Sequence, residues 1–302
     1  MAELSWQPPA VASVAVIGLD CRFPDAHDPP ALLDTILTGR RAFRQVPPGR
    51  LSLSGRFAGT RASRPRAGLI EGWRFDRAAF RIPEHVYRAA DPAHWLALET
   101  AARALAGVGC PGGRGLDRDR VGVIVGATTT DGLPLSVPAG ISSYFGFRGG
   151  SQAVAGACAS SLQAIASACA ALAARDIDVA LAGGVDLSLD PLVPAGLPGA
   201  DVAAGEMRVY DENPTGYLPG EGCGVVVLMR TAQARAAGLP VYAEIIGWGT
   251  SAGARPGVVA SDASSQLLAL RRAYGRAGVD PRDVALIEGH GSGTAADDDA
   301  EL

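Results

Sequence analysis

The chain has 302 residues, of which 48% are hydrophobic and 19% are charged, so it is long and apolar enough to bury a substantial core. The formal net charge is −4 and all 27 cationic residues are arginine, without a basic cluster that would support nucleic-acid binding. No uninterrupted apolar run reaches the roughly 18 residues of a membrane span, and no secretory signal pattern opens the chain. The five cysteines have no metal-ligand spacing, and we expect a reduced, cytoplasmic setting.

The first 125 residues predict alternating strands and helices. Residues 13–19 are apolar and β-branched, as in a buried strand, and residues 29–39 predict a helix with proline at its start and glycine at its end. Residues 49–73 are rich in Arg, Gly and Ser, which favours a surface loop. A helix is expected over 94–106, and a strand buried on both faces over 121–125.

A short apolar run, 152–157, ends at Cys158 and is followed by small, helix-favouring residues to about residue 174. This pattern predicts a strand, a tight turn that carries Cys158, and a long helix. Free N–H groups and the positive end of the helix dipole favour a thiolate, the nucleophilic form of cysteine. Ser160 and Ser161 fit the first helical turn, where hydroxyls can cap N–H groups. The alternative is that Cys158 is a small buried residue that packs the strand onto the helix.

The remainder of the chain predicts further strands over 177–182, 224–229 and 241–247, a helix over 264–276 and a strand over 284–287. This succession indicates an α/β architecture with parallel strand pairs. The last strand runs into residues 288–294, where a glycine on each side of His290 lets the imidazole point into a cleft. Cysteine and histidine distant in sequence can form the nucleophile–base pair of acyl transfer, whereas a structural imidazole is the alternative.

Together these motifs resemble the beta-ketoacyl synthases, the condensing enzymes of polyketide and fatty-acid synthesis. The resemblance rests on residues 14–24, 91–100, 156–162, 205–211, 219–228 and 288–294. It implies the thiolase-like fold, layered α/β/α/β/α, with Cys158 as the acyl nucleophile and His290 acting in decarboxylation and enolate stabilisation. Runs at 94–98, 183–191 and 205–211 look closest to the ketosynthases of iterative enediyne-type synthases.

In such an enzyme, an acyl chain passes from the phosphopantetheine of a carrier protein to the cysteine and is condensed with malonyl-carrier protein by decarboxylative Claisen condensation. The resemblance thus implies an acyl carrier protein as partner, no tightly bound cofactor, and a homodimer. Residues 1–235 correspond to the N-terminal half and 236–302 to the start of the C-terminal half. The family's second histidine, its lysine and its oxyanion segment would follow Leu302, so we expect an incomplete second half, exposed apolar surface, and a partner that supplies the rest.

Two departures from the family pattern keep other functions open. The segment 127–137 is shorter than in typical ketosynthases, and Ala155 stands where aspartate is common. A non-catalytic ketosynthase relic, or a partner subunit of a polyketide synthase, is therefore an alternative. A cysteine hydrolase is a further one, which would need an orienting residue such as Asp297, Asp298 or Asp299 after His290.

Overall fold

The computed structural model describes residues 13–47, 66–127, 135–187, 205–253 and 262–302. Within them a six-stranded sheet has the order β5-β4-β6-β7-β1-β8, and a small second sheet pairs β2 with β3. The strands are β1 Val14–Arg22, β2 Phe43–Gln45, β3 Arg66–Gly68, β4 Val121–Ala127, β5 Ser151–Val154, β6 Val179–Asp186, β7 Gly222–Arg230 and β8 Ala243–Ile245. The helices are α1 Pro29–Leu37, α2 Glu84–Ala89, α3 Pro92–Gly107, α4 Val137–Phe145, α5 Ser160–Ala173, α6 Thr231–Ala236, α7 Ala263–Ala277 and α8 Ala295–Glu301.

The large sheet is mixed. Strand β4 pairs in parallel with β5 and β6, whereas β7 is antiparallel to β6 and β1, and β8 is antiparallel to β1. The prediction of parallel pairs is therefore correct around β4 and wrong for the other half of the sheet. The α/β architecture itself is confirmed.

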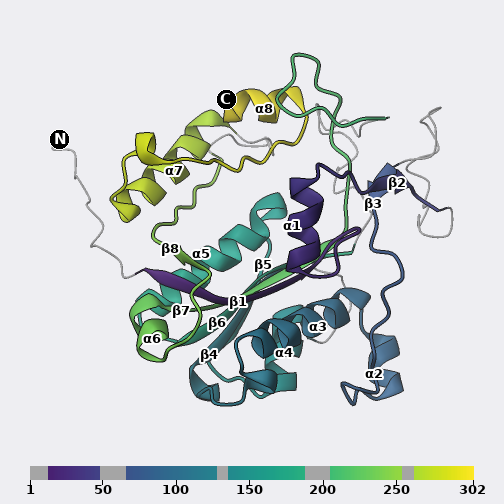
Figure 1. Cartoon of the computed structure of the whole chain (residues 1–302), viewed down its shortest axis with the longest axis vertical. Helices are drawn as coiled ribbons and strands as arrows, with labels where there is room; N and C mark the ends of the chain where they lie inside the picture. Colours follow the sequence, from purple (N-terminus) through teal and green to yellow (C-terminus); the bar gives the residue numbers. More distant parts are fainter. Residues whose placement is uncertain (1–12, 48–65, 128–134, 188–204, 254–261) are drawn as a thin grey trace.

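Helices cover both faces of this sheet, with α3 and α4 on one side and α5 on the other (Figure 1). On α3, Leu96, Ala101 and Leu105 are fully buried in the main core against β1 and β7. On α5, buried residues recur four apart, at Ala164, Ala168 and Leu172, and pack on β4 and β6. Burial of the Leu172 side chain alone contributes roughly 1.5–3 kcal/mol, which helps to hold α5 on the sheet.

Two predicted elements differ from the structure. Residues 284–287 form no strand, and among the described strands none pairs with them, so Leu286 and Ile287 remain 83% and 77% exposed. A strand needs hydrogen bonds from a neighbouring strand, which apolar composition alone does not supply. The predicted surface loop 49–73 lies outside the described residues up to 65, but its later part forms β3 and buries Ala67 and Leu69.

Among the described residues, four helices are not predicted by the sequence pattern, and α4 is the longest of α2, α4, α6 and α8. Helix α4 begins with Pro138 in its first turn and buries Val137, Ile141 and Phe145, four residues apart, beside α3. No helix in the described part of the chain has the length and hydropathy needed to cross a bilayer.

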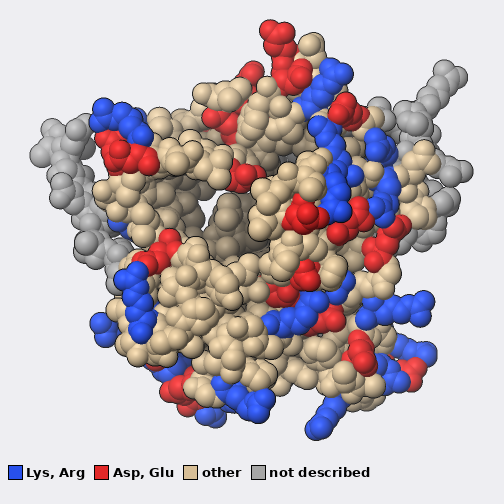
Figure 2. All heavy atoms as spheres, viewed as in Figure 1, with Lys and Arg blue, Asp and Glu red and all other residues tan. Residues whose placement is uncertain are grey.

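One face of the molecule is hollowed beneath α7 (Figure 2). A cavity of about 560 Å³ lies there between β5, α5, residues 250–252 and α7. Its lining includes Gln152, Val154, Gln163, Ser167, Ser251 and Arg272. Arginines and acidic residues are interspersed on the face shown, so this view has no extended basic surface (Figure 2).

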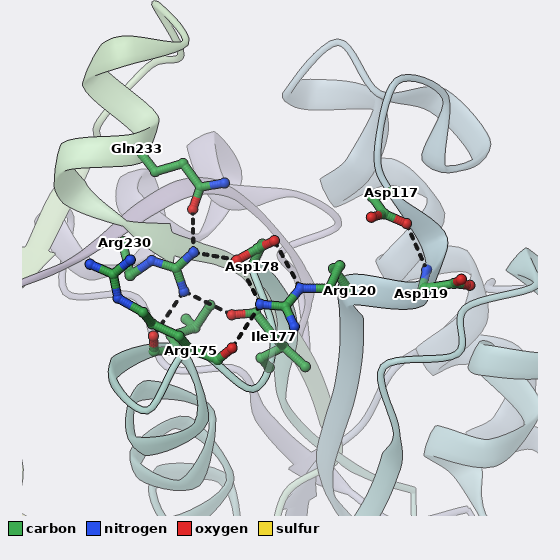
Figure 3. A network of polar contacts seen from close by, with 9 residues as sticks. Asp117, Asp119, Arg120, Arg175, Ile177, Asp178, Arg230 and Gln233 are labelled. Atoms are coloured by element: carbon green, nitrogen blue, oxygen red, sulfur yellow. Dashed lines mark hydrogen bonds and ion pairs between the residues drawn. The ribbon is translucent and has the colours of Figure 1, made fainter.

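A polar network fastens the C-terminal end of α5 to the sheet (Figure 3). Arg230, at the end of β7, donates to the carbonyl oxygens of Leu172 and Ile177 at 2.9 and 2.8 Å and forms an ion pair with Asp178. Arg120 donates from Nε to the same carboxylate at 3.0 Å. Hydrogen bonds from Arg120 and Arg230 lower the pKa of Asp178 to about 2.

Substitution Asp178→Asn will lower the free energy of unfolding at pH 7 by about 1–2 kcal/mol, the linkage value reduced because the carboxylate is partly exposed. The folded-state pKa lies below the ordinary value of 3.8, so this stabilisation is present above about pH 4 and is lost as the pH falls towards 2. Urea unfolding across that range measures it. Asp119→Asn, which removes an exposed ion pair with Arg148, is the control and should have little effect. A stability difference for Asp178→Asn that stays constant down to pH 2 would contradict the assignment.

Candidate active site

Cys158 lies in a strained turn between a strand and a helix. Strand β5 ends at Val154, and Cys158 occupies the short 3-10 turn Ala157–Ala159 directly before α5. Ala157 has a φ of 49°, a left-handed conformation that a residue with a side chain rarely adopts. Strain of this kind is common where a functional group must be presented to solvent, and Cys158 is exposed. The predicted strand, turn and helix are confirmed.

The Ser160 hydroxyl holds this turn together. Its oxygen accepts a hydrogen bond from the backbone N–H of Gly156 at 2.8 Å, and its O–H donates to the carbonyl oxygen of Ala157 at 2.6 Å. The sequence pattern predicts Ser160 in the first turn of the helix, and it is the first residue of α5. In the structure it closes the turn that presents Cys158.

Two glycines set the height of α5 above the sheet. A Cβ atom on Gly126, near the end of β4, would lie 2.6 Å from the Ser160 carbonyl carbon and 2.7 Å from the Ser161 nitrogen. A Cβ atom on Gly184, in β6, would lie 2.8 Å from the Ser161 Cβ. The start of α5 therefore rests directly on glycine backbone, and this contact fixes where Cys158 lies. The glycines at positions 126 and 184 are the signal in the sequence for this contact, which the motifs described above do not indicate.

The loop that carries His290 reaches Cys158 from the far end of the chain. It lies against residues 207–217, and the N–H of Gly216 donates to the carbonyl of Gly293 at 2.8 Å. The imidazole of His290 lies close enough to the Cys158 thiol for each to shift the pKa of the other. The structure thus brings together the two candidate residues that the sequence motifs indicate.

This contact changes the ionisation of both side chains. The His290 imidazole lowers the pKa of Cys158 below that of an ordinary thiol, against an opposing effect of burial. The Cys158 thiol raises the pKa of His290, and the carboxylates of Glu301 and Asp297 add to the increase. Tyr217 lies nearby, and its pKa is raised by burial and by the negative charge of Cys158. The arrangement favours a thiolate beside an imidazolium.

The other four cysteines have the opposite tendency. Burial raises the pKa of Cys21 to about 11 and those of Cys169 and Cys223 to about 12, and it also raises the pKa of Cys110. Cys158 is therefore the thiol that ionises most readily. No cluster of His, Cys, Asp or Glu suited to a metal ion occurs among the described residues.

Acidic residues of α8 hold the histidine loop. Asp297 accepts hydrogen bonds from the hydroxyls of Ser292 and Thr294 at 3.0 and 3.1 Å, and Asp298 accepts the N–H of Gly293 at 3.1 Å. These carboxylates bond hydroxyl and backbone groups of the loop. The hydrolase alternative needs a carboxylate that orients the His290 imidazole. In the described structure, Asp297 and Asp298 bond these other groups of the loop instead.

Comparisons with known proteins match the whole architecture. The profile described as "Beta-ketoacyl synthase, N-terminal domain" matches residues 12–134 and 128–234, and that described as "Beta-ketoacyl synthase, C-terminal domain" matches residues 242–302. The chain is 36% identical over 95% of its length to a phenolphthiocerol/phthiocerol polyketide synthase of Mycobacterium bovis, and 33% identical over 96% to polyketide synthase 2 of Metarhizium acridum. It spans only 17% and 16% of these relatives.

Solved structures agree. The ketosynthase from module 6 of the Bacillus subtilis bacillaene synthase superposes with a TM-score of 0.85 at 30% identity, over 96% of this chain and 53% of that one. An oxazolomycin ketosynthase domain of Streptomyces albus superposes with a TM-score of 0.83 at 29% identity, over 96% of this chain and 56% of that one. The fold is the thiolase-like fold of ketosynthases, and the chain belongs to the beta-ketoacyl synthase family.

Proposed function

We propose that this chain is a ketosynthase-type acyltransferase of polyketide or fatty-acid synthesis, in which Cys158 accepts an acyl group from the phosphopantetheine thioester of a carrier protein. The observation that carries the proposal is the contact between the exposed Cys158 thiol and the His290 imidazole, which lowers the pKa of the thiol. A nucleophile of this kind is what transfer from one thioester to another requires.

The first half-reaction uses these two side chains. The Cys158 thiolate attacks the acyl carbonyl carbon, the bond between that carbon and the phosphopantetheine sulfur breaks, and the departing thiolate takes up a proton. The protonated imidazole of His290, with its raised pKa, is the adjacent proton donor. The positive end of α5 stabilises the thiolate before attack.

In the condensation step of a complete enzyme, malonyl on a carrier protein loses carbon dioxide and its enolate carbon attacks the thioester carbonyl of acylated Cys158. The carbon–sulfur bond breaks and the sulfur leaves as thiolate. His290 donates a hydrogen bond to the enolate oxygen while decarboxylation occurs, a form of electrostatic stabilisation that acts mainly on the transition state. No tightly bound cofactor takes part in either step.

The proposal extends to the two parts of the chain and to its association with other chains. Residues 1–235 form the N-terminal half and 236–302 the start of the C-terminal half, a division that the two matching profiles support. A second copy in a homodimer, or a partner protein, covers the exposed apolar residues Leu286 and Ile287 in this proposal. Support comes from the exposure of these side chains and from the lack of a pairing partner for 284–287 among the described strands. The enediyne-type subclass and a cytoplasmic location belong to the same proposal, the latter supported by five free cysteines.

Acyl loading tests the proposal. The protein is incubated with a short acyl-phosphopantetheine thioester and its intact mass is measured. We expect an adduct of one acyl group that is absent in Cys158→Ala and retained in Cys110→Ala, the control at a partly exposed cysteine. An absence of adduct on folded protein would instead support the non-catalytic relic or the role of a partner in a larger synthase.

A further inference from the structure

Tyr210 lies against the loop that carries His290 and is linked to it through one carboxylate. The Tyr210 hydroxyl donates to Oε2 of Glu301 at 2.6 Å. The same carboxylate accepts the backbone N–H of His290 at 2.6 Å, through Oε1, and that of Gly291 at 2.8 Å, through Oε2. Glu301 therefore joins the tyrosine hydroxyl to the main chain at the histidine.

Because the residues on either side of His290 are glycines, Tyr210 and Val209 can pack against the main chain there. A Cβ atom on Gly289 would lie 2.0 Å from the Tyr210 hydroxyl oxygen. A Cβ atom on Gly291 would lie 2.6 Å from Cγ1 of Val209 and 3.5 Å from the same hydroxyl. The sequence pattern suggests that these glycines border an open cleft, whereas in the structure they admit a close contact with residues 209 and 210.

The backbone of Tyr210 is itself strained. Its φ of 52° is in the left-handed region, which is costly for an aromatic residue. Its N–H donates to Oδ2 of Asp298 at 2.8 Å, and Asp298 is only 4% exposed. Two carboxylates of α8 thus hold Tyr210, one at the main chain and one at the hydroxyl. A strained conformation that is fixed from both ends beside a site indicates a positioning role.

We infer that Tyr210 is a positioning residue for the proposed reaction: by holding Glu301, it fixes the His290 main chain so that the imidazole faces the Cys158 sulfur. This inference rests on the proposed function, because it concerns the activation of the same thiol. It assigns to Tyr210 no contact with substrate.

The charged groups around Cys158 and His290 can be left unchanged in a test of Tyr210. Besides each other, Cys158 faces Tyr217 and Asp297, and His290 faces Glu301 and Asp297. Glu301 raises the pKa of Tyr210 to about 12, so the phenol is neutral at physiological pH. Substitution Tyr210→Phe therefore removes one hydrogen bond and no charge. A change in the ionisation of Cys158 would then report the orientation of His290.

The test is the pH dependence of alkylation of Cys158 by iodoacetamide, followed by peptide mass in the full chain. We expect the midpoint of Tyr210→Phe to lie about 0.5–1 pH unit above that of the unaltered protein, the effect of losing roughly one hydrogen bond. In a Glu301→Ala background, the same substitution should have almost no further effect, because its acceptor is gone. Tyr242→Phe, at a tyrosine that is 61% exposed, is the matched control and should leave the midpoint unchanged.

The possible results separate the two proposals. A lowered midpoint in the unaltered protein that is identical in Tyr210→Phe would overturn the role of Tyr210 and leave the proposed function intact. An ordinary thiol midpoint in the unaltered protein would instead count against the proposed nucleophile. Melting temperatures of all variants show whether the fold is preserved, and Tyr210→Phe retains the ring that packs on Gly289.

Discussion

Substitution His290→Ala will raise the pKa of Cys158 and slow its alkylation at pH 7, because a higher pKa leaves a smaller fraction of the sulfur as the reactive thiolate. The contact with the imidazole is the largest cause of the lowered pKa, and burial, which acts against it, remains in the variant. The alkylation rate should therefore recover once the pH exceeds the pKa of an ordinary thiol. Acyl loading should slow at least as much, since the variant also lacks the proton donor.

His85→Ala is the control for this prediction, because His85 is exposed on α2. Both variants are compared with the unaltered protein by peptide mass over a range of pH. If His290→Ala and His85→Ala gave the same profile for Cys158, the imidazole would have no part in activating the thiol.

Substitution Gly126→Ala will lower the free energy of unfolding by about 1–3 kcal/mol, the cost of overpacking a close contact, and will also slow acyl loading. The new methyl group would meet the backbone of Ser160 and Ser161, which cannot rotate away as a side chain can. The start of α5 must then move off the sheet, and Cys158 moves with it. Urea unfolding and loading rates on the same preparation measure the two effects.

Gly107→Ala provides the comparison, because a Cβ atom at the end of α3 meets no other atom within 4 Å. Alanine there should be neutral or slightly stabilising. Equal stability and equal loading of the two variants would contradict the contact between β4 and α5 as the element that positions Cys158.

The sequence predicted best where one short stretch determines its own structure. The apolar run before Cys158 and the small residues after it give strand, turn and helix in the structure, and the same holds for α3, α7 and β4. Family membership could also be inferred, because the motifs around Cys158 and His290 are specific. The catalytic roles of these two residues stay predictions.

Features that depend on distant contacts could not be predicted. Residues 284–287 have strand composition, but strand formation needs a pairing neighbour, and no described strand supplies one. The link between Tyr210 and Glu301 joins residues 91 positions apart, and nothing local to either residue indicates it. The sequence marks the glycines beside His290 as significant, but it does not indicate that Val209 and Tyr210 pack against them.

The position of the acyl group after loading tests Cys158 as the acceptor most directly. The loaded protein is digested in the absence of thiol reductants, which would cleave the thioester, and the masses of the cysteine-containing peptides are measured. We predict that the acyl mass falls on the peptide with Cys158, and that Cys21, Cys110, Cys169 and Cys223, whose pKa values are raised, carry none. An acyl group on any of those four cysteines while Cys158 stays free would contradict the assignment of the site.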